Sequence, residues 1–344
     1  MSKLVVAGAW TIETNAEAGK DILGAQPVNS RLDYLREVLR AFDGFCREAA
    51  RARAATDGVI FIFVAPEYYF KSTRVNVERS LSKAERQQII AALTGLSRDY
   101  PHTVLIPGTI FWSKPADDKA RKKAQTRLGQ NINAYGTGNQ LGQKWTALRA
   151  RGGPDQVQYV SYNSAYVFYN GETYKYHKMS DASENLDADL RRNTLFIPGS
   201  RPGYFPDLGH TGVTFGIEIC ADHQAAVLNQ TVDIHILSSA ATTSVPANIR
   251  ARPGGLFIHA SSTTTEFLFN RGGTFEAPAK ASMAFSATNF LDAGQLREQR
   301  ETFLAGRIGD NRDRTPQSRI DMYNKVYNMA ASHGRLDTWV TELN

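Results

Sequence analysis

The stretch that decides the fold is Thr214-Phe-Gly-Ile-Glu-Ile-Cys-Ala-Asp-His223, an apolar run that ends in a thiol, a carboxylate and an imidazole. Its bulky residues alternate with smaller or polar ones, which is the two-residue period of a β-strand. The apolar residues of the following segment, 225–228, favour a helix. This order of strand and helix places Cys220 at a helix N-terminus, where backbone N–H groups and the helix dipole favour a thiolate.

Two further predicted strands, the first of them apolar, end in groups that suit a reactive thiol. Val59-Ile-Phe-Ile-Phe-Val-Ala-Pro-Glu67 delivers a carboxylate, and Tyr174-Lys-Tyr-His-Lys178 delivers an amine. A glutamate within hydrogen-bond reach of a cysteine acts as its general base, and an ammonium group stabilises the negative charge that develops on an attacked carbonyl oxygen. We therefore expect Glu67, Lys178 and Cys220 to converge as catalytic residues at one pole of a sheet sandwich.

At these three motifs the chain resembles the nitrilase, or carbon–nitrogen hydrolase, superfamily. Pro66-Glu67, Tyr176-His-Lys178-Met and Ile219-Cys220-Ala-Asp222 match the Glu, Lys and Cys motifs in the family's order, within about residues 4–290. The resemblance implies an α/β fold, namely a four-layer α-β-β-α sandwich. It also implies a thiol-dependent hydrolase of non-peptide C–N bonds, in which Cys220 forms a thioester and ammonia or an amine leaves.

Four residues near the triad are candidates for contacts with a small-molecule substrate: Tyr68, Glu184, Asp222 and His223. Many members of the family carry a further glutamate shortly after the lysine, and Glu184 is the match here. Many also carry an arginine two positions after the Asp of the cysteine motif, where this chain has Gln224. Nitrilases commonly continue the cysteine with Trp and Glu, so Ala221-Asp222 favours amide hydrolysis, with nitrile hydrolysis by the same triad as the alternative.

The composition is ordinary for a soluble globular protein, with 42% hydrophobic and 22% charged residues among 344. The formal charge of +6 arises partly in one polar segment that contains Lys114, Lys119, Arg121, Lys122, Lys123 and Arg127. Because no aromatic residues are interleaved among these charges, they favour a solvated loop over a nucleic-acid-binding face.

The cysteine count and the absence of other motifs set the remaining expectations. Only Cys46 and Cys220 occur, so no disulfide framework is expected, and a reducing, cytoplasmic setting follows. The longest apolar runs are strand-sized, which predicts no membrane span. His-Glu-x-x-His, Cys-x-x-Cys and a Gly-rich phosphate loop are lacking, so no metal or cofactor is expected.

Along the chain, strands alternate with helices, which predicts helices packed on sheet faces. A cap-and-acid pattern at 30–33 opens an amphipathic helix that carries Cys46 on its apolar stripe, and Ser82 to Glu85 forms a capping box for a second helix that Tyr100-Pro101 stops. A third strand is expected at 103–112. Asn170-Gly171 between alternating segments predicts a hairpin.

Two segments depart from this alternation. Residues 113–160 are polar and lack apolar periodicity, so we expect a long loop or insertion at the mouth of the pocket, within a hydrolase domain of residues 1–290. Residues 191–206 are expected to be loop-like. Residues 291–344 are expected to form a C-terminal helical extension, with Ile320, Tyr323 and Tyr327 on a face that packs on the body or on a partner subunit.

The expected strands at 232–239 and 255–261 carry His235 and His259, which we interpret as core residues with structural hydrogen bonds. For assembly, the resemblance implies at least a homodimer, formed by stacking two sandwiches through the helix expected at 225–228.

Two functions of other classes stay open at this point. A metal-dependent nuclease or phosphodiesterase can also be built from packed sheets, with Glu67 as a cation ligand and Asp222-His223 as general base. That interpretation gives Lys178 and Cys220 no role. A non-catalytic binding protein on the same scaffold is the other alternative, although all three triad positions are filled.

Overall fold

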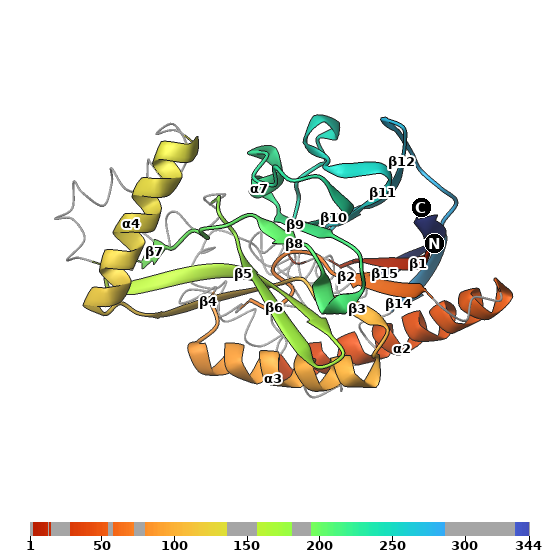
Figure 1. Ribbon diagram of the computed structural model, residues 1–344. Helices are drawn as coiled ribbons and strands as arrows, with labels where there is room; N and C mark the ends of the chain where they lie inside the picture. Colours follow the sequence, from red (N-terminus) through yellow and green to blue (C-terminus); the bar gives the residue numbers. More distant parts are fainter. Residues whose placement is uncertain are drawn as a thin grey trace, which may run out of the picture.

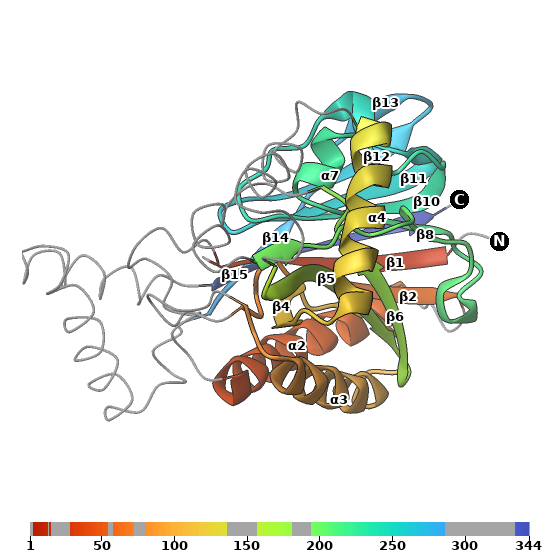
Figure 2. The same cartoon turned by 90° about the vertical axis from the view of Figure 1, so that its left-hand side faces the viewer.

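Two β-sheets packed face to face form the centre of the molecule (Figure 1). The computed structural model describes residues 3–12, 14, 28–53, 58–71, 80–135, 157–180, 194–285 and 334–343. Helices α2 (Val28–Ala52) and α3 (Lys83–Asp99) cover one face of the larger sheet, the face that points away from the smaller sheet, as Figures 1 and 2 both show. The described chain is therefore a mixed α/β structure, as predicted.

The larger sheet has nine strands, of which seven follow the order β14-β15-β1-β2-β3-β5-β4, while β6 and β7 both pair with β5. Strands β1, β2 and β3 run parallel, so their carboxyl ends lie at the same edge. The bounds are β1 (Lys3–Thr11), β2 (Val59–Val64), β3 (Thr103–Ile106), β4 (Thr109–Pro115), β5 (Tyr159–Tyr169), β6 (Glu172–His177), β7 (Thr194–Phe196), β14 (Ala281–Phe285) and β15 (Gly334–Leu343).

The smaller sheet has six strands in the order β13-β12-β11-β10-β9-β8. Its central strands β9, β10 and β11 are parallel, so their carboxyl ends also share one edge. Three of its strands, β9, β10 and β11, match the strands predicted from the sequence. The bounds are β8 (Gly203–Phe205), β9 (Phe215–Ile219), β10 (Val232–Ser238), β11 (Ala251–Ala260), β12 (Thr265–Arg271) and β13 (Thr274–Glu276).

Strand alternation sorts the apolar side chains into two cores. On β2, Ile62 and Val64 belong to the core between the sheets, together with Ile217 and Ile219 of β9. Phe63 of β2 points the other way and packs with the helices. Each such side chain contributes roughly 1.5–3 kcal/mol when fully buried, so this alternation fixes which face of the larger sheet receives the helices and which receives the second sheet.

Local sequence signals are confirmed where they are strongest. Ser82 and Glu85 form the predicted capping box of α3, and the helix ends at Tyr100. Asn170 and Gly171 both have positive φ, 46° and 84°, in the turn between β5 and β6. Two consecutive positive φ angles are the requirement of a tight hairpin turn, which Asn-Gly meets with little strain.

The polar segment 113–160 is not the continuous loop that was expected. It contains α4 (Asp118–Tyr135), which lies beside the far ends of β4 and β5 (Figures 1 and 2). Ala120 and Ala124 of this helix are buried in the helix-side core. Small alanines contribute little to a periodicity pattern among lysines and arginines, which is why the helix escaped prediction.

Two other expectations are corrected by the strands of the structure. The single strand expected at 103–112 is two strands, because Gly108, with φ of 79°, turns the chain between β3 and β4. A Cβ at Gly108 would lie 2.2 Å from the carbonyl oxygen of Pro66, so the turn requires glycine. The loop expected at 191–206 contains the short strands β7 and β8.

The C-terminal segment 334–343 is a strand rather than part of a helical extension. β15 pairs antiparallel with β1 over its whole length, from Lys3 opposite Leu343 to Thr11 opposite Arg335. Leu336 and Trp339 are buried, and the pairing with β1 and β14 stabilises the extended conformation. Residues 291–333 of the predicted extension, including Ile320, Tyr323 and Tyr327, lie outside the described residues.

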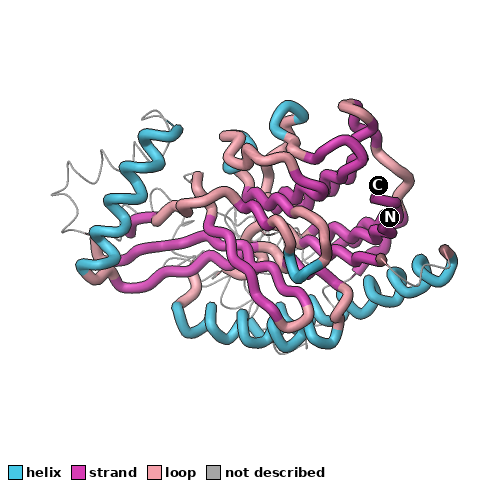
Figure 3. The backbone as a smooth tube through the Cα atoms, viewed as in Figure 1, coloured by secondary structure: helices cyan, strands magenta, loops and turns pink. Residues whose placement is uncertain are grey.

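The helix expected after Cys220 is reduced to α7 (Ala221–Gln224). Ala226 has a φ of 50°, which ends helical geometry, and Val227 and Leu228 are buried within the protomer. Ala225 and Ala226 of the same segment are partly exposed, and a subunit contact through this segment stays a prediction. Within the described ranges no long helix covers the outer face of the smaller sheet, as the tube in Figure 3 shows, so three layers are seen where four were predicted.

No helix among the described residues is long and apolar enough to cross a membrane.

Candidate active site

The three predicted catalytic residues lie where strands end. Glu67 follows β2, Lys178 directly follows β6 and Cys220 directly follows β9. All three are buried, with 0%, 1% and 5% of their surface exposed. The Lys178 Nζ lies 2.6 Å from Oε1 of Glu67, and the two side chains form a buried ion pair across the larger sheet. The structure therefore brings Glu67 and Lys178 into direct contact, as the strand-end argument predicted.

Glu67 is held by donors on both of its carboxylate oxygens. Asn163 Nδ2 donates to Oε1 at 2.8 Å, and the backbone N–H of Ala240 donates to Oε2 at 3.2 Å. The backbone N–H of Glu67 in turn donates to the carbonyl oxygen of Ser239. Hydrogen bonds to a carboxylate are about twice as strong as neutral ones, so this carboxylate has one fixed orientation.

Cys220 sits in a strained turn that aims its thiol inward. Its φ is 50° and its ψ is −109°, a region that non-glycine residues rarely occupy. Regular alternation would put Cys220 on the same face as Glu218, which is the outer face of the smaller sheet. The thiol belongs instead to the core between the sheets, beside Ile219. The positive φ therefore redirects the side chain towards the layer that also holds Glu67 and Lys178.

The end of β10 ties Cys220 to the Glu67 loop. The backbone N–H of Cys220 donates to the carbonyl oxygen of Ser238 at 3.0 Å. Ser238 Oγ donates to the carbonyl oxygen of Ala65 at 2.9 Å, two residues before Glu67. Because the next residues, Ser239 and Ala240, bind Glu67 itself, one short segment of the smaller sheet contacts both the Cys220 turn and Glu67.

Asp222 ties the Cys220 turn to the Lys178 turn. It accepts hydrogen bonds from Tyr176 Oη at 2.6 Å, Ser180 N at 2.6 Å and Met179 N at 3.1 Å. Complete burial raises the pKa of Asp222 to about 7, while the Lys178 charge and the Tyr176 hydroxyl act in the opposite direction. Protein donors therefore occupy this buried carboxyl, which links the Cys220 turn to the Lys178 turn, and its contact with substrate stays a prediction.

His223 is hydrogen-bonded within the protein, and its contact with substrate also stays a prediction. Its ring is fully buried, with Nδ1 2.6 Å from Glu218 Oε2. Nε2 accepts a hydrogen bond from the backbone N–H of Val245 at 3.0 Å. Both ring nitrogens therefore have protein partners on the outer face of the smaller sheet.

The other two predicted substrate contacts have different outcomes. Glu184 lies outside the described residues. Tyr68 follows Glu67 with a φ of 63°, and its ring centroid lies 5.8 Å from Lys178 Nζ. The ring therefore lies beside the ion pair, and its contact with substrate stays a prediction.

Three residues that hold the site were missed by sequence reasoning. Asn163 orients Glu67, Ser238 carries the tie to Cys220, and Thr242 Oγ1 lies 2.8 Å from Cys220 Sγ. Asn163 could have been found, because an amide at a buried position of a strand requires a partner. The hydroxyl contacts of Ser238 and Thr242 depend on how the fold places distant segments side by side, for which the sequence carries no local signal.

Comparisons with known proteins add little to this geometry. No protein-family model matches the chain, and no curated protein sequence matches it significantly. Among solved structures, a glutamine-dependent NAD(+) synthetase from Cytophaga hutchinsonii is similar to it with a TM-score of 0.35 and 11% sequence identity. That alignment covers 80% of this chain and 40% of the synthetase chain, so this chain spans less than half of its length.

Proposed function

We propose that this protein is a thiol-dependent hydrolase of a non-peptide C–N bond, of the amidase type, with Cys220 as nucleophile. The observation that carries the proposal is the buried Glu67–Lys178 ion pair at 2.6 Å. Two residues tie this pair to the strained turn of Cys220: Ser238, which binds the Ala65 carbonyl oxygen and the Cys220 N–H, and Asp222, which binds the N–H of Met179 beside Lys178. Strain at a buried thiol persists only when its surroundings over-determine it, and such strain clusters at active sites.

In the proposed reaction Glu67 takes the proton of Cys220, and the thiolate attacks the amide carbon to form a C–S bond. Lys178 and a backbone N–H stabilise the oxyanion. The C–N bond then breaks as Glu67 returns the proton to the leaving amine, which leaves a thioester. Water attacks the thioester, Glu67 accepts a proton from that water, and the acid leaves as the proton returns to Cys220.

The geometry does not favour a metal-dependent nuclease. Both oxygens of Glu67 face protein donors, namely Lys178, Asn163 and the backbone of Ala240. A carboxylate in an ion pair with an ammonium group would need to lose that partner before it bound a cation. The proposed general base of the nuclease, Asp222-His223, is buried and bonded to protein groups.

Several parts of the proposal rest on the resemblance alone. Amide rather than nitrile as substrate rests on Ala221-Asp222 after the cysteine. A four-layer arrangement, a homodimer and a cytoplasmic location are predicted on the same basis or from the cysteine count.

Ammonia release from a panel of primary amides and nitriles tests the function. We expect release from amides that iodoacetamide abolishes and EDTA leaves unchanged. A phosphodiesterase activity that EDTA abolishes and that survives Cys220→Ala would instead support the nuclease.

Substitution tests whether the triad acts as one unit. Glu67→Gln, Lys178→Met and Cys220→Ala should each lower kcat by at least about 10³-fold, and double variants should lose little more, because each residue serves the same transition state. Cys46→Ala, which changes the other thiol, is the matched control and should keep its activity. Losses that add up in the double variants would contradict a shared transition state.

A further inference from the structure

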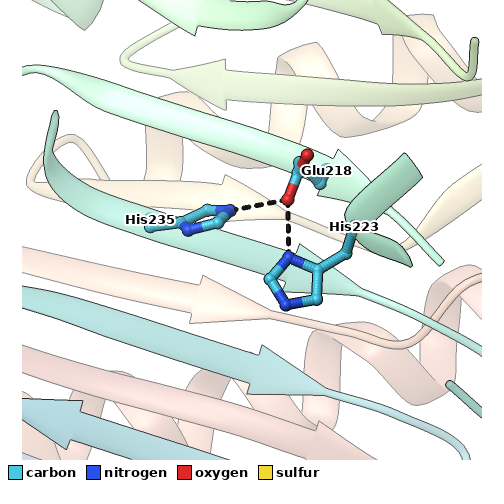
Figure 4. Close-up of side chains that lie close together, drawn as sticks. All are labelled: Glu218, His223 and His235. Carbon is cyan, nitrogen blue, oxygen red and sulfur yellow. Dashed lines mark hydrogen bonds and ion pairs between the residues drawn. The ribbon is translucent and has the colours of Figure 1, made fainter. Parts of the chain in front are cut away.

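A second cluster of titratable side chains lies on the outer face of the smaller sheet, behind the Cys220 turn. Figure 4 shows Glu218 of β9, His235 of β10 and His223 of α7 pointing towards one another. Glu218 Oε2 lies 2.6 Å from His223 Nδ1 and 3.0 Å from His235 Nε2. All three side chains are fully buried. Two histidines and a glutamate in such contact resemble a metal site, so the protonation of each ring decides what the cluster is.

Backbone donors fix the tautomer of both rings. The N–H of Val245 donates to Nε2 of His223, and the N–H of Arg250 donates to Nδ1 of His235, each at 3.0 Å. A nitrogen that accepts a hydrogen bond carries no proton. The proton of each neutral ring must therefore lie on the nitrogen that faces Glu218. Both rings donate to the same carboxylate oxygen, and the other oxygen accepts from the N–H of Leu228 at 2.8 Å.

This arrangement does not suit a metal ion. A histidine that binds a metal usually donates its other ring N–H to a carbonyl or carboxylate group. Here the other nitrogen of each ring faces an N–H donor, so a metal bound between the rings would require both imidazoles to lose their remaining proton. The separations between the facing atoms are those of hydrogen bonds.

We propose that Glu218, His223 and His235 form a hydrogen-bonded clamp that holds the strained Cys220 turn, and that they are positioning residues for the nucleophile rather than metal ligands. The inference rests on the proposed function only in assigning Cys220 as nucleophile. Glu218 lies before the turn and His223 after it, so their bond at 2.6 Å closes the chain around Cys220.

Two more contacts anchor the clamp to the rest of the smaller sheet. His235 belongs to β10, whose end also carries Ser238, the residue that accepts the N–H of Cys220. Asn248 Nδ2 donates to the carbonyl oxygen of His223 at 2.8 Å. The turn is thus held on its outer side by the clamp and on its inner side by Asp222 and Ser238.

The charge state of the cluster supports this assignment. Burial alone would raise the pKa of Glu218, but the hydrogen bonds from His223 and His235 outweigh it and lower the pKa to about 2. Burial lowers the pKa of His235, against the opposing effect of Glu218. One carboxylate with two neutral rings satisfies every polar group named above.

Paired substitutions separate the bond to Glu218 from the other effects of each ring. His223→Asn keeps an N–H near the position of Nδ1, whereas His223→Leu removes it, and both lose the acceptor for Val245. His235→Gln and His235→Leu form the equivalent pair at Nε2. Leu39→Ala, a core change in α2 on the far side of the larger sheet, is the control for lost stability alone.

The first measurement is the rate of Cys220 alkylation by iodoacetamide, followed by mass spectrometry of the folded variants, which requires no substrate. We expect the Leu variants to react about 10- to 100-fold more slowly than the native protein, since a displacement of about 1 Å at a reacting centre can cost that much in rate. The Asn and Gln variants should lie closer to the native rate than their Leu partners, and Leu39→Ala should match it. Where the protein hydrolyses an amide, the Leu variants should also lower kcat with little change in KM.

Three results would overturn the clamp. One is a Leu variant that folds and alkylates at the native rate, and another is an Asn or Gln variant no closer to native than its Leu partner. The third is stoichiometric zinc or another transition metal in the purified protein that the Leu variants lack, since it would make the cluster a metal centre. If no amide is hydrolysed while the alkylation pattern holds, the proposed function fails and the clamp stands.

Discussion

Cys46 and Cys220 carry the same thiol in opposite surroundings. Cys46 lies in the core between α2 and the larger sheet, where burial first, and the Asp43 carboxylate second, raise the pKa of the thiol, against the effect of Arg47. Cys220 lies at a strained turn within 2.8 Å of a hydroxyl group, in the layer that holds Lys178. Reactivity follows the thiolate fraction and access, so the two should differ sharply.

Iodoacetamide at neutral pH should modify Cys220 in the folded protein and leave Cys46 unmodified. Peptide mapping after limited labelling measures the two extents, and denatured protein, in which both thiols react, is the control. Faster labelling of Cys46 in the folded state would reverse the assignment of nucleophile and core residue.

Asn163 offers a test of how Glu67 is oriented. Asn163→Ala removes the donor at 2.8 Å from Oε1, so the carboxylate gains freedom and kcat should fall by about 10- to 100-fold with little change in KM. Amide-hydrolysis kinetics give both constants.

Asn270→Ala is the matched control, because it removes a buried amide on β12 whose Nδ2 donates to the Ala251 carbonyl oxygen of β11. It should lose stability and keep kcat. An equal fall in kcat for both variants would mean that Asn163 serves folding alone.

At this scale the sequence predicted the candidate triad and missed residues that hold it. Glu67, Lys178 and Cys220 are recognisable because each follows a predicted strand. Asp222 and His223 were also noticed, but beside a candidate nucleophile a buried positioning residue and a substrate contact have the same sequence signature. The hydrogen-bond partners, Tyr176 for Asp222 and Glu218 for His223, are visible only in the structure.

Helix α3 shows how far local signals fix an element. Its N-terminus combines the Ser82 side chain, which accepts from the N–H of Glu85, with the Glu85 side chain, which accepts from the N–H of Ser82. Both bonds lie within four residues, so the sequence alone could predict them.

Ser82→Ala should lower the free energy of unfolding by about 1 kcal/mol, whereas Ser82→Gly should lower it by only a few tenths. Urea unfolding measures both. Because glycine is worse than alanine inside a helix, this order of the two variants is specific to a cap position, and the reverse order would show that Ser82 does not cap α3.

Elements set by distant pairing escaped prediction. β15 was predicted as helix because charged and apolar residues upstream suggested one, yet its conformation depends on β1. The split between β3 and β4 depends on the approach of Gly108 to Pro66, and α7 is cut short at Ala226. In each case the deciding contact lies outside the window that a periodicity argument uses.

For the whole molecule, Glu218 links the clamp to acid stability. The pKa of its carboxyl, about 2, lies below the ordinary glutamate value of 4.5, so its contribution is present above pH 4.5 and is lost as the pH falls towards 2. A shift of this size corresponds to about 3 kcal/mol at most. For Asp222 the sign is opposite. Its pKa of about 7 lies above the ordinary value of 3.8, so the stability that its protonated carboxyl contributes is lost as the pH rises from 3.8 to 7.

Glu218→Gln should therefore be less stable than the native protein at pH 6, and the difference should shrink as the pH falls to 3. Urea unfolding at several pH values gives both curves, and Glu172→Gln, at an exposed position of β6, is the control. A constant difference across this range would show that Glu218 contributes no pH-dependent stability.

The pairing of β1 with β15 has a consequence for biosynthesis. β1 leaves the ribosome early and finds β2 soon afterwards, but its other edge stays open until residues 334–343 have been translated. Trp339 of that late strand stacks on Phe267 of β12 with ring centroids 5.1 Å apart, so its arrival also joins the two sheets. A stalled or truncated nascent chain would expose an unpaired apolar strand edge, the feature that chaperones bind and that promotes aggregation.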